Sequence, residues 1–308
     1  MNEKIKALKD NISLHFKGKD EVVSNLIITL LAGGHALIED VPGVGKTTLA
    51  KALASSIDAS FGRIQFTPDT LPGDVVGTSV FDSKTSEFKI VKGPVHNQLL
   101  LADEINRTSP RTQSALLEAM EERQVTIDGT TFELPELFMV IATQNPSEQI
   151  GTYPLPEAEL DRFMVKLKIG YPAKDMQMTL AKSFLEGSLT EKTEPVLTAD
   201  EVISMKNDVA NVIIQDEVIE YALSIVDATR KLSELEYGLS PRASLDLLMA
   251  AKANAYINDR DYVIPQDILD MAKVVLTHRL IPTSKARMDK YTGEQLLTQV
   301  TDKLERPR

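Results

Sequence analysis

The chain has 308 residues, a formal net charge of −11 and no cysteine. Its length allows about two domains of ordinary size, and the lack of cysteine excludes a disulfide framework and a thiolate metal site. The acidic balance argues against nucleic acid as a partner, because phosphate neutralisation requires clustered Lys and Arg. No apolar run approaches the roughly 20 residues that span a bilayer, and the N-terminus lacks the apolar region of a signal peptide. We therefore expect a cytoplasmic protein with no stable membrane insertion.

Short apolar runs alternate with helix-like segments between about residues 20 and 170. This alternation is typical of βαβ units and predicts an α/β fold with a five-stranded, largely parallel sheet flanked by helices. The N-terminal residues read as the start of a helix. The expected strands cover residues 36–38, 63–66, 98–102, 138–142 and 165–169, and the expected helices cover residues 46–57, 110–122 and 156–163.

Two β-hairpins interrupt this rhythm as insertions. One spans residues 125–134 and turns at Asp128-Gly129, a pair that supplies the positive φ angles of a type I′ turn. The other pairs residues 78–81 with 88–91 across a longer loop. A plain nucleotide-binding sheet needs neither hairpin.

After about residue 190 strand signals stop and helix signals continue. Thr198 and Glu201 form a capping-box pattern that opens a first helix, and a second is expected over residues 216–233. Ser240 followed by proline opens a third to about residue 256, and Pro265 opens a fourth to about residue 278. We therefore predict a core domain at residues 1–190 and an all-helical domain at 191–308, with the junction near 175–197.

A glycine-rich loop follows the first expected strand and opens a helix, the context in which a phosphate-binding loop has physical meaning. Backbone N–H groups and the helix N-terminus would bind phosphate oxygens. Lys46 would reach the β- and γ-phosphates of a nucleotide, and Thr47 would hold Mg²⁺. Asp40 stands where the motif G-x-x-x-x-G-K-[ST] has its first glycine. The loop comprises Asp40, Val41, Pro42, Gly43, Val44, Gly45, Lys46, Thr47 and Thr48.

Two carboxylates end the apolar strand expected at residues 98–102. Asp103 and Glu104 would therefore lie at the carboxyl edge of the sheet, where ligands bind in open α/β folds. We expect Asp103 to complete the Mg²⁺ shell and Glu104 to polarise the attacking water. A GTPase would need an Asn-Lys-x-Asp motif to read the base, and the sequence has none.

Further polar residues complete the expected site. Asn145, at the tip of the strand at 138–142, could lie between the water and the γ-phosphate, although Asn-Pro could simply start a turn. Arg162 is the arginine-finger candidate, and Arg242 opens a helix of the second domain, where it would sense the nucleotide. Arg107 is a weaker candidate. Each arginine could instead form a structural ion pair.

Together these residues resemble the AAA+ ATPases, and specifically the MoxR family, with magnesium-chelatase ATPase subunits as relatives. The acidic residue at position 40 is common in this family. The resemblance covers nearly the whole chain and is most specific at residues 39–48, 63–77 (RIQFTPDTLPGDVVG), 99–113 (LLLADEINRTSPRTQ), 114–121, 142–146, 151–163 (GTYPLPEAELDRF) and 240–243 (SPRA).

The resemblance implies an AAA+ core and a helical lid that assemble into a ring, commonly a hexamer. Arg162 would then act on a neighbouring subunit's nucleotide, with Asn145 as first sensor and Arg242 as second. The hairpins would point toward a central pore. Lys19 and Asp20 fall where AAA+ proteins contact adenine.

The function implied is ATP hydrolysis with Mg²⁺ that drives chaperone-like remodelling or maturation of an unnamed client. Members of the family usually work with a partner that carries a von Willebrand factor A domain. A metal-chelatase motor subunit would share every active-site residue and remains an alternative. A DNA-loading AAA+ protein fits the charge poorly. A regulator switched by nucleotide binding alone is a further alternative, and the Glu104 carboxylate argues against it.

Overall fold

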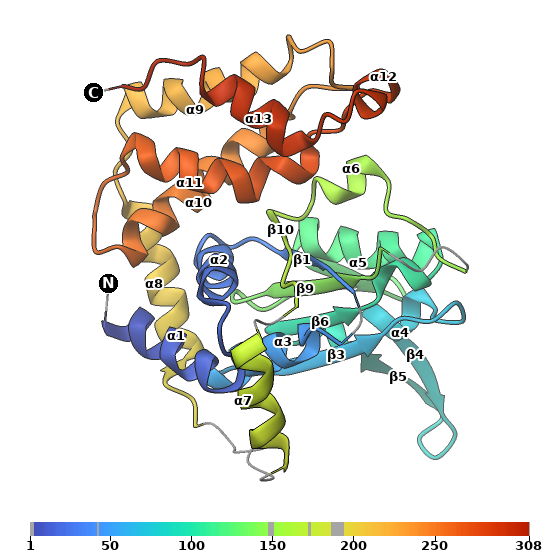
Figure 1. The fold of residues 1–308 in the computed structure, drawn as a ribbon. Helices are drawn as coiled ribbons and strands as arrows, with labels where there is room; N and C mark the ends of the chain where they lie inside the picture. The colour runs from blue at the N-terminus through green and yellow to red at the C-terminus, as the bar shows by residue number, and fades with distance from the viewer. Residues whose placement is uncertain (1–2, 42, 147–150, 172–173, 186–193, 308) are drawn as a thin grey trace.

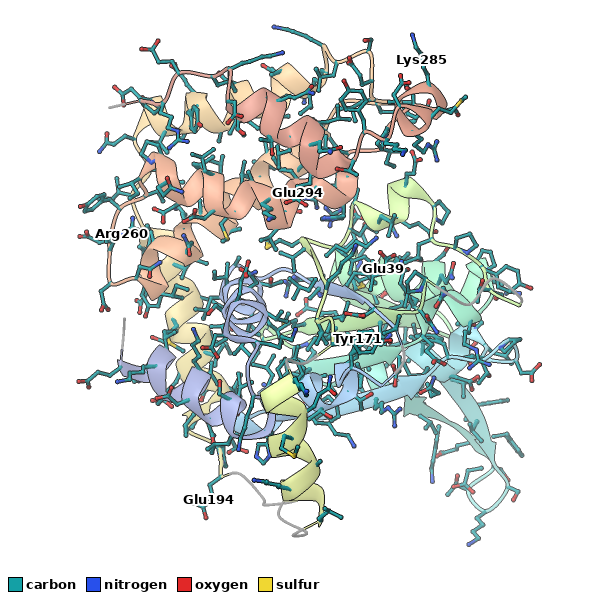
Figure 2. The ribbon with its side chains drawn as sticks, viewed as in Figure 1. Glu39, Tyr171, Glu194, Arg260, Lys285 and Glu294 are labelled. Atoms are coloured by element: carbon teal, nitrogen blue, oxygen red, sulfur yellow. The ribbon has the colours of Figure 1, made fainter. Side chains whose placement is uncertain are left out.

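The computed structural model describes residues 3–41, 43–146, 151–171, 174–185 and 194–307. Figure 1 shows a sheet-bearing half and a helical half, the latter formed by the C-terminal third of the chain. In Figure 2, Glu39 and Tyr171 lie in the sheet-bearing half, and Arg260, Lys285 and Glu294 in the helical half. None of the helices in the described ranges combines the length and apolarity needed to cross a membrane.

The central sheet has five strands in the order β10-β1-β9-β6-β3, and every neighbouring pair is parallel. This confirms the sheet predicted from the sequence. Because all five strands run the same way, their carboxyl ends share one edge, and residues that follow the strands gather there. The strands are β1 (Ala36–Glu39), β3 (Phe61–Gln65), β6 (Leu99–Asp103), β9 (Met139–Gln144) and β10 (Val165–Leu167).

Alternate strand residues serve two separate cores, as expected for a sheet covered on both faces. Ile38 and Leu101 join the larger cluster with α1, α2 and α3, whereas Leu37 and Leu100 join the smaller cluster with α5. The helices of this half are α1 (Glu3–His15), α2 (Asp20–Leu31), α3 (Lys46–Ser56), α4 (Pro72–Val76), α5 (Pro110–Glu122), α6 (Glu157–Leu160) and α7 (Lys174–Leu185), with 3-10 turns η1 (Pro94–His96) and η2 (Ile105–Arg107).

Both predicted hairpins are present. β4 (Gly77–Asp82) and β5 (Glu87–Lys92) project away from the body of the molecule (Figure 1), while β7 (Gln124–Ile127) pairs with β8 (Thr130–Glu133). The turn between β7 and β8 has φ values of 48° at Asp128 and 78° at Gly129, as a type I′ turn requires.

The helical lid follows the predicted order, and Thr198 and Glu201 form the expected capping box. The second predicted helix ends at Thr229 rather than residue 233, and the last turn of the fourth is a separate 3-10 turn. The lid contains α8 (Ala199–Asn211), α9 (Asp216–Thr229), α10 (Pro241–Ile257), α11 (Pro265–Leu276), η4 (Thr277–Arg279), α12 (Ser284–Met288) and α13 (Gly293–Thr301).

Two features of the junction were not expected from the sequence. Residues 174–185 form α7, and β2 (Ile57–Asp58) pairs in parallel with β11 (Leu197–Thr198). Two-residue strands carry no periodicity that could predict them. The larger apolar cluster includes residues of α2 and of α8, α10 and α11, so one core runs through both halves of the molecule. The domain boundary at 190/191 remains a prediction.

Candidate functional site

The glycine-rich loop lies at the carboxyl edge of the sheet, between the end of β1 and the start of α3. Gly43 has φ of 82° and Gly45 has φ of 95°, a region that strains residues with a side chain. A Cβ atom at Gly45 would also lie 3.1 Å from the ring of Phe16. The loop thus needs glycine for backbone conformation and for space. Pro42, one of the predicted loop residues, lies outside the described residues.

Lys46 begins α3, and its side chain is 9% exposed. Its ammonium group donates to the carbonyl oxygens of Asp40 at 2.6 Å and Gln144 at 3.3 Å. Both carbonyls lie at the carboxyl ends of strands. The ammonium group is therefore held at the mouth of the loop, where it would contact a bound phosphate group. The other described residues of the loop are Val41, Val44 and Thr48.

The Asp40 carboxylate binds backbone N–H groups within its own chain. Its Oδ2 accepts from Ile169 at 2.8 Å and Gly170 at 2.6 Å, and its Oδ1 accepts from Val41 at 2.8 Å. The acid at this unusual position therefore ties the loop to the segment that follows β10. A glycine there would leave these three donors without this acceptor.

Asp103, at the end of β6, receives three polar groups. Thr143 donates to its Oδ1 at 2.7 Å, and the hydroxyl of Thr47 lies 3.4 Å from its Oδ2. Arg63, on the neighbouring strand β3, pairs with the same Oδ2 at 2.7 Å. Within the described ranges, no group of three or more His, Cys, Asp or Glu could hold a metal. A hydroxyl and a carboxylate beside a phosphate loop do fit Mg²⁺, which takes few protein oxygens and completes its shell with phosphates and water.

Glu104 has φ of 57°, in the left-handed region that non-glycine residues rarely adopt. Its N–H donates to Thr143 Oγ1 at 2.9 Å. Its Oε2 accepts from Gln65 at 2.7 Å and pairs with Arg107 at 2.9 Å. The unusual backbone and these contacts fix the carboxylate beside Asp103, in the same cluster.

Asn145 follows β9 at the same edge and is 2% exposed. Its carbonyl oxygen accepts from Asn106 at 3.3 Å, which joins the ends of β6 and β9. Of the predicted adenine contacts, Lys19 donates to the carbonyl oxygen of Tyr171 at 3.1 Å, and Asp20 is exposed at the start of α2. This segment lies next to the loop, since Phe16 contacts Gly45.

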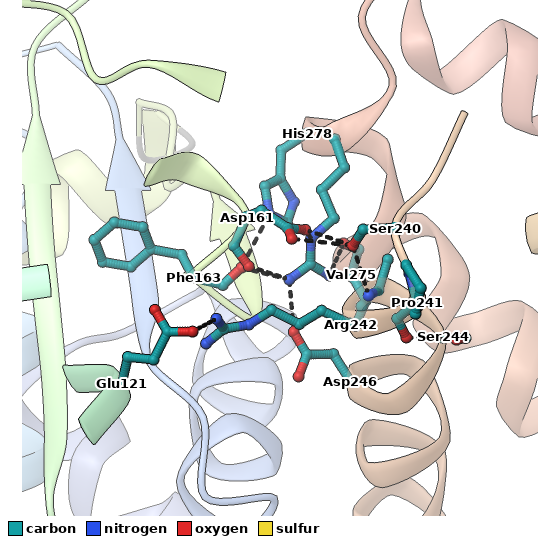
Figure 3. Close-up of polar contacts among 12 residues, drawn as sticks. Glu121, Asp161, Phe163, Ser240, Pro241, Arg242, Ser244, Asp246, Val275 and His278 are labelled. Carbon is teal, nitrogen blue, oxygen red and sulfur yellow. Dashed lines mark hydrogen bonds and ion pairs between the residues drawn. The ribbon is translucent and has the colours of Figure 1, made fainter. Parts of the chain in front are cut away.

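Arg162 and Arg242 lie elsewhere, at the amino edge of the sheet. Arg162 precedes β10, which begins at Val165. Arg162 Nε pairs with Glu121 Oε2 at 2.9 Å. Arg242 Nη1 pairs with Glu121 Oε1 at 2.9 Å (Figure 3). The structure therefore brings these two candidates together but not to the phosphate loop of their own chain.

A second network holds the chain around the two arginines. Arg279, 4% exposed at its side chain, pairs with Asp161 at 2.8 Å and with Asp246 at 2.6 Å. The hydroxyl of Ser240 donates to Asp161 at 3.0 Å (Figure 3). Burial raises the pKa of Asp246, and the Arg279 charge opposes that rise. Arg162 follows Asp161 directly, so this network joins its segment to the lid.

Comparison with known proteins identifies the fold. Residues 35–165 match the family described as "ATPase family associated with various cellular activities (AAA)", and residues 227–300 match the AAA lid domain. The uncharacterised protein YeaC of Bacillus subtilis is 46% identical over 97% of this chain and 93% of its own length. The chaperone MoxR1 of Mycobacterium tuberculosis is 39% identical over 94% of this chain and 79% of its own.

The chain is a MoxR-family AAA ATPase. Its fold also matches the crystal structure of a proposed ATPase from Cytophaga hutchinsonii, with a TM-score of 0.93 and 38% identity over 99% of this chain and 96% of that one. Membership of this ATPase family implies that the chain binds a nucleotide. The family match at residues 35–165 begins just before β1 and ends at the start of β10, so it encloses the candidate site residues from Asp40 to Asn145.

Several contacts in this MoxR-family site were not found by sequence reasoning. Arg63 and Gln65 occupy alternate positions of β3, and the β3–β6 register sets Gln65 opposite Asp103. Their alternation was visible in the sequence, but the register was not. Thr143 lies two positions before Asn145 at the end of the same strand, where only Asn145 was predicted as a site residue. No local pattern predicted a role for Glu121, because a glutamate at an exposed position near the end of a helix is typical of a solvated surface residue.

Proposed function

We propose that this MoxR-family ATPase hydrolyses ATP with Mg²⁺ in a hexameric ring, and that turnover drives chaperone-like remodelling of a client protein. The observation that carries the proposal is the separation of two charged clusters. The carboxylates and Lys46 lie at the carboxyl edge of the sheet, and Arg162 and Arg242 lie at the amino edge. A phosphate bound to one edge cannot reach the other edge of the same sheet.

At the carboxyl edge we assign a role to each side chain. Lys46 leaves the two strand-end carbonyls and binds the β- and γ-phosphates, and the loop N–H groups bind the remaining phosphate oxygens. Thr47 and Asp103 would hold Mg²⁺, which would neutralise charge on the phosphates. Glu104 orients and polarises the attacking water, and Asn145 binds that water or the γ-phosphate.

The amino edge completes the site of a neighbouring copy in this proposal. Two guanidinium groups 29% and 35% exposed at their side chains are available to an anion from outside the chain. A head-to-tail contact brings the amino edge of one copy to the carboxyl edge of the next, and such contacts form a ring when the rotation between copies closes. Arg162 then acts as an arginine finger and Arg242 as a sensor, both across the interface.

The remodelling part of the proposal is supported by the projecting β4–β5 hairpin. Phe81 and Phe88 are 54% and 70% exposed, and their rings meet edge to face at 5.3 Å between centroids. Exposed aromatic pairs are typical of protein contact sites. MoxR1, a 39% identical relative, is named a chaperone. A von Willebrand factor A domain protein as partner follows from the family resemblance alone.

Mixing two inactive variants tests the shared site. We expect Lys46→Ala to abolish nucleotide binding in its own subunit and Arg162→Ala to disable the neighbour's site, so each alone shows little ATP turnover. In mixed rings, roughly a quarter of the interfaces join an intact loop to an intact arginine, and turnover returns in that proportion. Mixed rings verified by light scattering that recover no ATPase activity would contradict the shared site.

A further inference from the structure

Glu121 is the resident counter-ion of both arginines at the amino edge. It lies near the C-terminal end of α5, while Arg162 belongs to the core and Arg242 to the first turn of α10 in the lid. Each arginine reaches a different oxygen of the same carboxylate at 2.9 Å. One side chain thus neutralises two guanidinium groups that come from two parts of the molecule. Figure 3 shows its contact with Arg242.

Without these two ion pairs, a carboxylate would be unfavourable at the helix position that Glu121 occupies. The C-terminus of a helix carries partial negative charge, which repels an anion in the last turn. No basic residue of α5 lies in that turn, so compensation within the helix is missing. The side chain of Glu121 is 41% exposed, and ion pairs at this exposure contribute little to stability because solvent screens the charges. The contact is therefore weak enough to be exchanged for another anion.

The two arginines do not depend on Glu121 for their place in the fold. Asp161, next to Arg162, is bound by Ser240 and by the buried Arg279. Ser240 is also the N-cap of the helix in which Arg242 stands, and its hydroxyl accepts from the Ala243 N–H. A network separate from Glu121 thus fixes both backbones, and the pair can stay in place when the carboxylate moves away.

We infer that Glu121 is an internal competitor that occupies the two-arginine site in the free subunit and is displaced by the terminal phosphate of a nucleotide bound to a second copy of this chain. The inference rests on the proposed ring. Within this ring, Glu121 is a positioning residue that screens the charges of Arg162 and Arg242 from each other before assembly. Assembly has to break its two exposed ion pairs, and this cost opposes ring formation.

The experiment compares Glu121→Gln with Glu122→Gln, a neighbouring exposed glutamate of the same helix. Sedimentation velocity over a protein dilution series, with a non-hydrolysable ATP analogue and Mg²⁺, gives the concentration of half-assembly. We expect Glu121→Gln to lower it about two- to tenfold, because the competing charge is lost, and Glu122→Gln to leave it unchanged. Without nucleotide, the melting temperature of Glu121→Gln should fall below that of Glu122→Gln, since the free subunit loses both pairs.

Two further variants separate the possible results. Glu121→Asp keeps the charge but shortens its reach, so it should shift half-assembly in the same direction by less. In an Arg162→Ala, Arg242→Ala background, Glu121→Gln should have no effect. If wild-type protein assembles and Glu121→Gln assembles no better than Glu122→Gln, the inference is wrong and the ring stands. If wild-type protein fails to assemble at every concentration, the proposed ring is wrong, and the inference fails with it.

Discussion

At the scale of single residues, the charged groups of the proposed nucleotide site already have partners within the chain. Arg63 pairs with Asp103, the carboxylate that we assign to Mg²⁺, and Arg107 pairs with Glu104, the carboxylate that we assign to the attacking water. Lys46 is bound to strand-end carbonyls. Binding of a metal and a nucleotide therefore exchanges existing contacts and does not fill a bare site.

The Arg63–Asp103 pair predicts how the ATPase depends on Mg²⁺. Removing the guanidinium in Arg63→Ala leaves Asp103 free for the metal, so the Mg²⁺ concentration for half-maximal nucleotide binding should fall about two- to fivefold. Arg63→Lys keeps the positive charge and should lower this Mg²⁺ concentration by less. A Mg²⁺ titration at fixed concentration of a fluorescent ATP analogue measures this. A weaker nucleotide affinity at saturating Mg²⁺, with an unchanged Mg²⁺ midpoint, would instead make Arg63 a nucleotide ligand.

At the scale of elements, the sequence predicted most of what the structure contains. Strand and helix periodicity, the Asp128-Gly129 turn and the Thr198–Glu201 capping box all depend on neighbouring residues, and these predictions are confirmed. Contacts between distant segments could not be predicted. The Asp40 carboxylate bonds to N–H groups 129 and 130 residues away, and no local pattern encodes such a pairing.

The Asp40 contacts predict that this acid supports the loop rather than the phosphate. Asp40→Ala leaves the N–H groups of Ile169 and Gly170 without their charged acceptor, and hydrogen bonds to charged groups contribute about 1.5–3 kcal/mol. We expect a lower melting temperature and at least about tenfold weaker nucleotide binding. Asp58→Ala, at an exposed aspartate of β2, is the matched control for both measurements. Unchanged melting with weakened binding would show that Asp40 acts on the ligand directly.

At the scale of the whole molecule, the edge at which a residue stands decides its assigned role. Sequence motifs named Arg162 and Arg242 as candidates, but only the parallel direction of β10 and the packing of the lid reveal that both lie at the edge opposite Lys46. The same packing buries His35 and partly buries His278 between parts of the fold. His35 lies at the amino end of β1, where its ring accepts from Val140 N–H at 2.9 Å, and His278 donates to Phe163 O at 3.1 Å from the lid.

These histidines predict a loss of stability in mild acid. Burial lowers the pKa of His35 and of His278 from 6.5 to about 3, with nearby arginine charges adding to the effect. Both rings stay neutral in the folded chain while the unfolded chain takes up protons, so the free energy of unfolding falls as pH drops from about 6.5 to about 3. At pH 5 the loss is about 2 kcal/mol for each buried histidine. Urea unfolding at pH 7, 6 and 5 measures this loss of unfolding free energy.

Two variants test whether His35 causes part of the loss. His35→Gln should reduce the slope of unfolding free energy against pH. Phe138→Leu, which alters the ring packed against His35 at 5.5 Å, should lower stability and keep the wild-type slope. Equal slopes in all three proteins would contradict a neutral, buried His35.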